Sequence, residues 1–297
     1  MLLANGERDH KNIRQARRLI INADDFGLSE KVNTGILKAM THGIVNSTSV
    51  MANMPSAEVG IRRLIASGFS SAGIHLNLTC GPSVTKMKGR ITRVDGTFRG
   101  AGLIWWLGMT QGLQASEVKA ELSAQIEQVM RLGLSISHID GHHHIHILPQ
   151  VAPLVCELAR EYKIPAVRLP LSRRQGLRWA ENCKWRLVNH FAARSRAYFT
   201  ASRLAMPDKF LAWYARGAET LDHLKRTLSS IEAGISEIGV HPGFEDESLV
   251  GVDSYRNERY LELIALCDPS MRHFIAECDI SLVDYNYVLE PSRCPCV

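Results

Sequence analysis

The sequence contains no apolar run that approaches the roughly 18 residues needed to cross a membrane. Residues 1–18 are polar and basic and lack the apolar segment of a secretory signal, so we expect a cytoplasmic protein. No internal repeat and no low-complexity linker divides the chain. We therefore expect one domain that spans all 297 residues.

The seven cysteines are scattered and odd in number, which argues against a disulfide framework and for reduced thiols. Two of them, Cys294 and Cys296, form a C-x-C pair at the end of the sequence. Such a pair can bind a metal, but a frayed chain end without a function explains it as well.

Acidic residues are scarce in one segment. From Arg168 to Phe210 the chain has ten lysines and arginines against two acidic residues, together with several aromatic residues. A basic and aromatic insert, which we place at about 171–217, can contact a membrane surface or an anionic or amphipathic substrate. A solvated helical excursion is the alternative explanation. No nucleic-acid-binding motif accompanies the charge, so we expect no nucleic acid partner.

Strand and helix patterns alternate along the chain. Apolar, β-branched segments predict strands at 18–23, 44–51, 73–78, 134–139, 166–170, 235–240 and 280–283. Amphipathic periodicity predicts helices from Ser29 to Gly43, at 57–66 and 116–133, from Pro149 to 158, and at 221–231 and 260–266. The alternation indicates βα units on a parallel sheet. We predict an α/β fold, an irregular TIM-like (β/α) barrel with the inserted helical segment.

Chemically capable side chains fall at or near the carboxyl ends of these strands, where barrel enzymes place their chemistry. They are Asp24, Asp25, His75, Asp140, His142, Arg168 and His241. Because strand side chains alternate in direction, Asp24 and Asp25 cannot both point the same way. One of the two carboxylates can ligate a metal while its neighbour acts as a base. A turn or a helix N-cap explains the pair equally well.

Four of the twelve histidines lie within five positions, in the segment His142-His143-His144-Ile145-His146. Imidazole is a common ligand for zinc and similar ions. His142, His144 and His146 share one face only if the strand continues through them. One catalytic ion needs fewer ligands, so some of these histidines support others or line the wall. A weak, adventitious metal site in a loop is the alternative.

Three single residues complete the candidate site, each with an ordinary alternative. His75 lies on the polar side of an alternating strand and can ligate a metal or be a satisfied rim residue. His241 precedes Pro242-Gly243 and can exchange protons, although the turn alone explains the motif. Arg168 can hold a carbonyl oxygen or an anion, or be a surface charge.

The motifs together resemble those of the YdjC-like carbohydrate deacetylases, which include the chitooligosaccharide deacetylases. They are Asn22-Ala-Asp-Asp-Phe-Gly27, Gly73-Ile-His-Leu-Asn-Leu-Thr79, His138-Ile-Asp-Gly-His-His-His-Ile-His146 with Pro149-Gln150, and Val240-His-Pro-Gly243. The match runs from about Leu19 to Leu289. Within the family the sequence looks most like the hopanoid-biosynthesis-associated branch.

The resemblance implies a metal-dependent hydrolase that removes an acetyl group from an N-acetylated amino sugar. By position, Asp25, His75 and a cluster histidine, with His142 favoured, would hold one divalent ion, zinc or magnesium. Asp24 would be the base and His241 the acid, with Asp140 or His146 supporting the ligands. The extension before Leu19 and the 171–217 insert depart from the family pattern and bear on substrate size.

The hopanoid branch implies an N-acetylglucosaminyl hopanoid as substrate, and free chitooligosaccharides are the alternative. Trp105, Trp106, Trp179 and the stretch 201–213 could form an apolar surface that accepts the lipid and contacts the inner membrane surface. Ordinary packing of two inserts is the competing explanation. Two other functions are a hydrolase of another bond, such as a phosphoester, and a sugar- or lipid-binding protein with a vestigial metal site.

Overall fold

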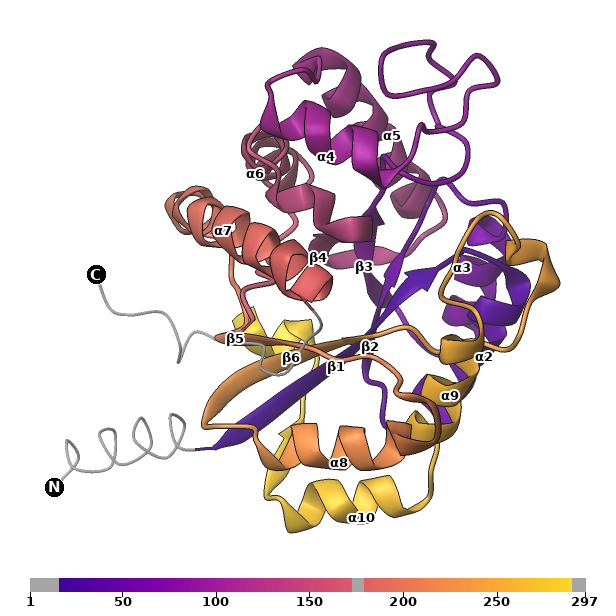
Figure 1. Cartoon of the computed structure of the whole chain (residues 1–297), viewed down its shortest axis with the longest axis vertical. Helices are drawn as coiled ribbons and strands as arrows, with labels where there is room; N and C mark the ends of the chain where they lie inside the picture. The colour runs from indigo at the N-terminus through magenta and orange to yellow at the C-terminus, as the bar shows by residue number, and fades with distance from the viewer. Residues whose placement is uncertain (1–15, 173–178, 290–297) are drawn as a thin grey trace, which may run out of the picture.

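A computed structural model describes residues 16–172 and 179–289 of the chain, with the side chains of 179–182 left aside (Figure 1). Its strands form one seven-stranded sheet in the order β4-β3-β2-β1-β6-β5, with β7 paired to the start of β1. All these strand pairs are parallel. The strands are β1 (Arg17–Phe26), β2 (Ser47–Val50), β3 (Ser71–Leu76), β4 (Ser135–Gly141), β5 (Lys209–Ala212), β6 (Gly234–Val240) and β7 (Ile280–Leu282).

Helices pack around this sheet, as the α/β prediction requires (Figure 1). They are α2 (Glu30–Thr41), α3 (Ala57–Ala66), α4 (Ala101–Met109), α5 (Ala115–Arg131), α6 (Ala152–Glu161), α7 (Trp179–Ala201), α8 (Thr220–Ser229), α9 (Asn257–Leu266) and α10 (Ser270–Glu277). Within the described residues no helix has the length and apolar character to cross a membrane. The predicted α/β, barrel-like architecture is confirmed. Its barrel is not closed, because β4 and β5 are the two edge strands of the described sheet and do not pair with each other.

The strand predicted at 166–170 is reduced to isolated bridges. Val167 pairs with Ile139 of β4, and Ala166 pairs with Ala205. Pro165 and Pro170 flank the segment and have no N–H to donate, so the ladder cannot extend through them. The wall of the barrel is therefore thin at this point, in the sense that isolated bridges replace a continuous strand.

Three further predictions need correction. The segment 171–217 is not purely helical, because it contains β5, which pairs in parallel with β6. The helix predicted from Pro149 begins only at Ala152, and Pro153 occupies its first turn. The short helix α10 and the strand β5 escaped prediction. Ser29 does cap α2 as expected, since its Oγ accepts the Val32 N–H at 3.2 Å.

The interior of the sheet is filled tightly at Gly73. A Cβ atom on this glycine would lie 2.4 Å from the imidazole of His138, which the next strand carries. The His138 ring stacks on Tyr285, with ring centroids 3.5 Å apart and planes at 8°. Burial lowers the pKa of His138 to about 3, so this histidine is a neutral part of the core.

Candidate active site

Asp24 and Asp25 lie next to the end of β1 and face different partners, as the alternation of strand side chains predicts. Both carboxylates are buried. The side chain of Asp24 meets Arg168, and that of Asp25 meets His75 and His142. Asp25 has a backbone φ of 67°, in the left-handed region that aspartate tolerates better than most residues.

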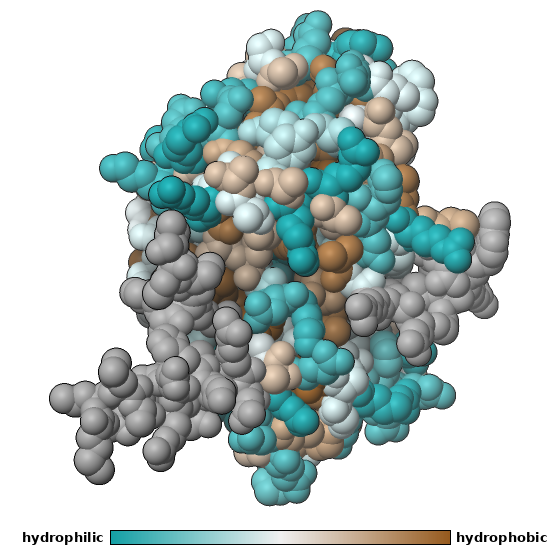
Figure 2. Space-filling view, turned by 90° about the vertical axis from the view of Figure 1, so that its left-hand side faces the viewer, coloured by the Kyte–Doolittle hydropathy of each residue, from teal (hydrophilic) through white to brown (hydrophobic). Residues whose placement is uncertain are grey.

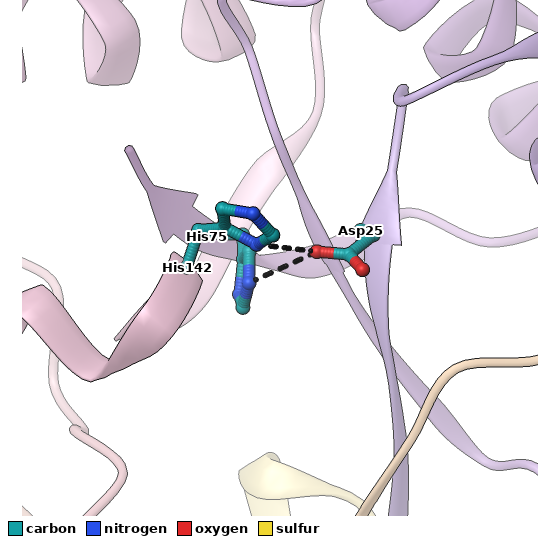
Figure 3. A group of neighbouring side chains, drawn as sticks. All are labelled: Asp25, His75 and His142. Atoms are coloured by element: carbon teal, nitrogen blue, oxygen red, sulfur yellow. Dashed lines mark hydrogen bonds and ion pairs between the residues drawn. The ribbon is translucent and has the colours of Figure 1, made fainter. Parts of the chain in front are cut away.

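Asp25, His75 and His142 point toward one another from β1, β3 and the segment after β4 (Figure 3). The Oδ1 of Asp25 lies 2.9 Å from His142 Nδ1 and 3.3 Å from His75 Nε2. One ligand atom from each of the three residues falls within 4.8 Å of the others. One carboxylate and two imidazoles form a donor set that zinc accepts while keeping coordination positions open. The three residues therefore fit a divalent ion.

Asp140 orients His75 from behind. The other imidazole nitrogen of His75, Nδ1, lies 2.8 Å from Asp140 Oδ1, so Nε2 is directed at Asp25. Ser49 donates to the second oxygen of Asp140 at 2.8 Å. A carboxylate behind a histidine fixes the tautomer and the direction of a metal-binding nitrogen. The structure thus places Asp140 where the sequence interpretation put a supporting residue.

The charges of the site favour a cation. Burial raises the pKa of Asp25, but the charges of His142 and Arg259 outweigh it and hold the pKa well below the ordinary value. Burial opposes a charge on His75, but Asp140, Asp25 and Asp24 raise its pKa to about 10. A proton on His75 offsets part of the negative charge of these carboxylates in the metal-free protein, and a divalent ion that displaces this proton would supply positive charge in its place.

Arg168 is fully buried among carboxylates. Its Nη1 and Nη2 each lie 2.7 Å from an oxygen of Asp24, which makes the pair bidentate. The guanidinium also contacts Asp140 at 2.9 Å and Glu237 at 2.8 Å. Burial raises the pKa of Asp24, but the charge of Arg168 brings it below the ordinary value, so Asp24 stays ionised. The suggestion that Arg168 binds a substrate oxygen is wrong, because its donors are occupied and its side chain is inaccessible.

His241 faces Asp24 from the end of β6. The Nε2 of His241 lies 3.9 Å from Asp24 Oδ2, and the side chain is 23% exposed. Its ring runs parallel to that of Tyr214, with centroids 6.0 Å apart, and meets Tyr255 edge-on. Its Nδ1 makes no hydrogen bond with any residue that the structure describes. A partly exposed histidine beside an ionised carboxylate can exchange protons with a bound molecule.

The chain leaves the strand at the histidine cluster, and residues His142–Ile147 form 3-10 turns interrupted by a kink. His143 and His144 adopt left-handed backbone conformations, with φ of 54° and 57°. The shared face that a continued strand would give to His142, His144 and His146 is therefore lost. Only His142 joins the metal-binding group.

The other three cluster histidines have separate surroundings. The Nδ1 of His143 pairs with the Thr79 hydroxyl at 2.9 Å. The ring of His144 packs edge-on against Trp185 and Phe210, so it has an aromatic packing role beside the site. His146 is buried, and its Nε2 lies 3.1 Å from the backbone oxygen of Arg168. His146 therefore supports Arg168 instead of the metal ligands.

Sequence interpretation missed Arg259, which is 2% exposed on α9. Its Nη2 lies 2.6 Å from Asp25 Oδ2. One signal was present in the sequence, because Arg259 and Glu262 share the buried face of α9 with Leu263 and Leu266. Charged residues in the apolar stripe of a helix need a buried partner, and the partner can be an active-site carboxylate.

Comparison of the sequence with known proteins identifies the family of the chain. The chain belongs to the YdjC-like protein family, whose model matches residues 18–277. The carbohydrate deacetylase of Geobacillus stearothermophilus is 32% identical over 91% of this chain and 97% of its own length. That of Vibrio parahaemolyticus serotype O3:K6 is 31% identical over 93% and 98%. The resemblance to YdjC-like carbohydrate deacetylases that the motifs indicated is confirmed.

One solved structure has the same fold throughout. It is a protein of Enterococcus faecalis V583, which its name provisionally calls a cellobiose-phosphate cleavage protein. The two chains are 25% identical and superpose with a TM-score of 0.74, over 92% of this chain and 99% of the other. The overall fold is therefore shared by a related protein.

Proposed function

We propose that the protein is a metal-dependent carbohydrate deacetylase that removes the acetyl group from an N-acetylglucosamine unit. The observation that carries this proposal is the grouping of Asp25, His75 and His142 beside the Asp24–His241 pair. Relatives that bear the name carbohydrate deacetylase support the reaction class. The products are acetate and a free amino sugar.

Asp25, His75 and His142 would hold the ion, with zinc favoured by the two imidazoles and magnesium as the alternative. When bound, the ion polarises the acetyl carbonyl and lowers the pKa of the attacking water. The buried Asp140 keeps His75 aimed at the site throughout. Among the described residues, one further group has metal-binding spacing, Asp24, His75 and Asp140, and it shares His75 with this centre.

Asp24 acts as the base in this proposal. It takes a proton from water as the water oxygen forms its bond to the acetyl carbon. Arg168 and Asn22 occupy most of the carboxylate, but the Oδ2 of Asp24 retains a lone pair on the side of His241. The arginine thus keeps the base ionised and fixes its direction, at some cost in basicity.

His241 acts as the acid. An amine is a poor leaving group unless it is protonated as the carbon–nitrogen bond breaks. The Nε2 of His241 lies 3.9 Å from Asp24 Oδ2, so the acid and the base lie side by side. With a substrate amide bound beside both residues, Asp24 would take a proton from the attacking water and His241 would give a proton to the departing nitrogen.

A hopanoid glycolipid is the substrate that we propose, and the surface beside the histidine cluster supports it. The indole N–H of Trp105 donates to the backbone oxygen of His143 at 2.9 Å, which places α4 at the rim of the site. On the same helix Trp106 is 54% exposed and Met109 is 38% exposed. Figure 2 shows apolar side chains in several small patches on the α7 side of the molecule, interrupted by hydrophilic ones.

The expectation of an apolar surface is wrong for part of the residues named. Trp213 and Phe210 are 1% and 5% exposed, so the stretch 201–213 packs inward instead of offering these side chains to a lipid. The side chain of Trp179 lies outside the described residues. The proposed contact with the inner membrane surface therefore rests on α4 and on the exposed basic side chains of α7, which include Arg186, Arg194 and Arg196.

The deciding experiment measures acetate release from N-acetylglucosaminyl hopanoid and from di-N-acetylchitobiose, with and without a chelator. Chelator-sensitive release from the lipid alone supports the whole proposal. Release from chitobiose alone keeps the reaction and makes the protein a chitooligosaccharide deacetylase of sugar catabolism. No release from either substrate by protein that has bound metal contradicts the proposal and favours a hydrolase of another bond.

A further inference from the structure

The start of α9 and the loop before it contact both halves of the candidate active site. Arg259 reaches Asp25, the metal-ligating carboxylate, and its Nη1 lies 3.4 Å from the backbone oxygen of His241. Glu262, one turn further along, accepts the His241 backbone N–H at 2.5 Å. Both polar groups of the His241 backbone are thus held by one helix, which also holds Asp25.

The two oxygens of Asp25 have different partners. Oδ1 faces the imidazoles of His75 and His142, and Oδ2 accepts from Arg259 Nη2 at 2.6 Å. Arg259 is itself anchored by Asp253, whose Oδ2 lies 2.7 Å from Nη2 and 2.9 Å from Nε. The guanidinium is therefore fixed between two carboxylates and cannot turn away from Asp25 without losing both.

We propose that Arg259 is a positioning residue that restricts Asp25 to ligation through Oδ1. This inference rests on the proposed metal-dependent function. A carboxylate can bind a metal through one oxygen or through two, and a second metal–oxygen bond would occupy a position that water or substrate needs. By engaging Oδ2, Arg259 keeps that position open, and by contacting the backbone of His241 it ties the acid to the metal ligand.

A purely structural ion pair would give a different result from a positioning residue. Loss of a structural pair changes the free energy of unfolding and leaves the metal site of the folded fraction intact. Loss of a positioning residue changes metal binding in protein that is still folded. Residues behind metal ligands typically change metal affinity by about 10- to 100-fold when they are replaced.

The test compares Arg259→Gln with wild-type protein by zinc affinity in chelator competition and by the visible absorption of the cobalt-substituted protein. We expect zinc binding to weaken about 10- to 100-fold and the cobalt absorption to lose intensity as Oδ2 becomes free to coordinate. Arg256→Gln is the matched control, because this arginine, directly before α9, has no hydrogen bond or ion pair from its side chain to another described residue.

A second variant keeps the inference testable if Arg259→Gln does not fold. Asp253→Asn removes the anchor of Arg259 but leaves the Arg259–Asp25 contact, and the Asp253 side chain is 17% exposed, so the fold should survive. We expect the same changes with smaller size. Zinc affinity within twofold of wild type or tighter, with an unchanged cobalt spectrum in folded variants, overturns the inference. Wild-type protein that binds neither ion overturns the proposed function, and the inference with it.

Discussion

Two adjacent carboxylates have different environments at the end of β1. Asp24 is paired with Arg168 and stays ionised, and Asp25 belongs to the metal-binding group. The sequence predicted this division from the alternation of side chains, because neighbours on a strand cannot share a direction. It could not say which partner each would meet, since Arg168 and Arg259 come from distant parts of the chain.

Replacing Asp24 should separate catalysis from metal binding. We expect Asp24→Asn to lower kcat for amide hydrolysis about 10²- to 10⁴-fold, because the base is lost. Zinc affinity should stay close to wild type, whereas Asp25→Asn should lose it. Acetate release and chelator competition measure the two effects. Unchanged turnover in Asp24→Asn would mean that another group takes the proton.

The role of His241 can be tested with the leaving group. We expect His241→Ala to lose about 10²- to 10⁴-fold in activity on N-acetylglucosamine units, because the amine must be protonated as it departs. An aryl acetate, whose phenolate leaves without a proton, should lose far less. The ratio of kcat/KM for the two substrates is the measurement. Equal losses on both would point to a structural role for His241.

The raised pKa of His75 predicts a proton count. At pH 7.5 the metal-free protein holds a proton on His75, because its pKa of about 10 lies above that pH. A metal ligand must be neutral, so zinc binding should release about one proton and should tighten as the pH rises toward 10. Calorimetric titrations in buffers of different ionisation enthalpy give the number. Zinc binding without proton release would contradict the protonated state of His75.

At the level of elements, sequence periodicity predicted most strands and helices, since each has a continuous apolar face. The histidine cluster was harder, because His143 and His144 take left-handed conformations that residues other than glycine rarely adopt, and no residue pattern predicts such a conformation there. The role of α9 was missed for another reason. Arg259 and Glu262 meet residues more than 20 positions away or across the whole chain, and periodicity carries no record of such partners.

Helix α4 can be tested for its contact with lipid. We expect the double variant Trp106→Ser, Met109→Ser to release acetate more slowly from a glycolipid in vesicles, because the exposed apolar contact is lost. Hydrolysis of a soluble chitooligosaccharide should not change. Met130→Ser is a suitable control, since Met130 is 46% exposed on α5. Equal losses on both substrates would show that α4 merely supports the fold.

At the level of the whole molecule, the order of strands agrees with a βα architecture, and the failure to close agrees with the two prolines beside Val167. Composition and periodicity could predict the class of fold but not this opening. Closure depends on the registry between β4, the 166–167 bridges and β5, which is set by packing in three dimensions and not by local pattern.

Arg168 should be the most sensitive single position for stability. Its removal leaves carboxylates of Asp24, Asp140 and Glu237 buried without their counter-charge. We expect Arg168→Met to lower the free energy of unfolding by about 3–5 kcal/mol. Urea denaturation measures the change. Arg62→Met is the control, since Arg62 is 65% exposed in an ion pair on α3 and should cost about 1 kcal/mol or less.

The thin wall of the barrel has a consequence for how the protein can change over time. Four backbone hydrogen bonds connect the 165–168 segment to Ile139 and Ala205. From this segment the guanidinium of Arg168 extends to carboxylates on β1, β4 and β6. The side chain that orients Asp24, the proposed base, therefore also connects the open side of the sheet to its interior. Substitutions that make surface loops more mobile can leave Asp24 in place. Substitutions that destabilise the 165–168 segment would instead displace Asp24, the proposed base. Thermal stability and turnover should therefore change together in variants of this segment.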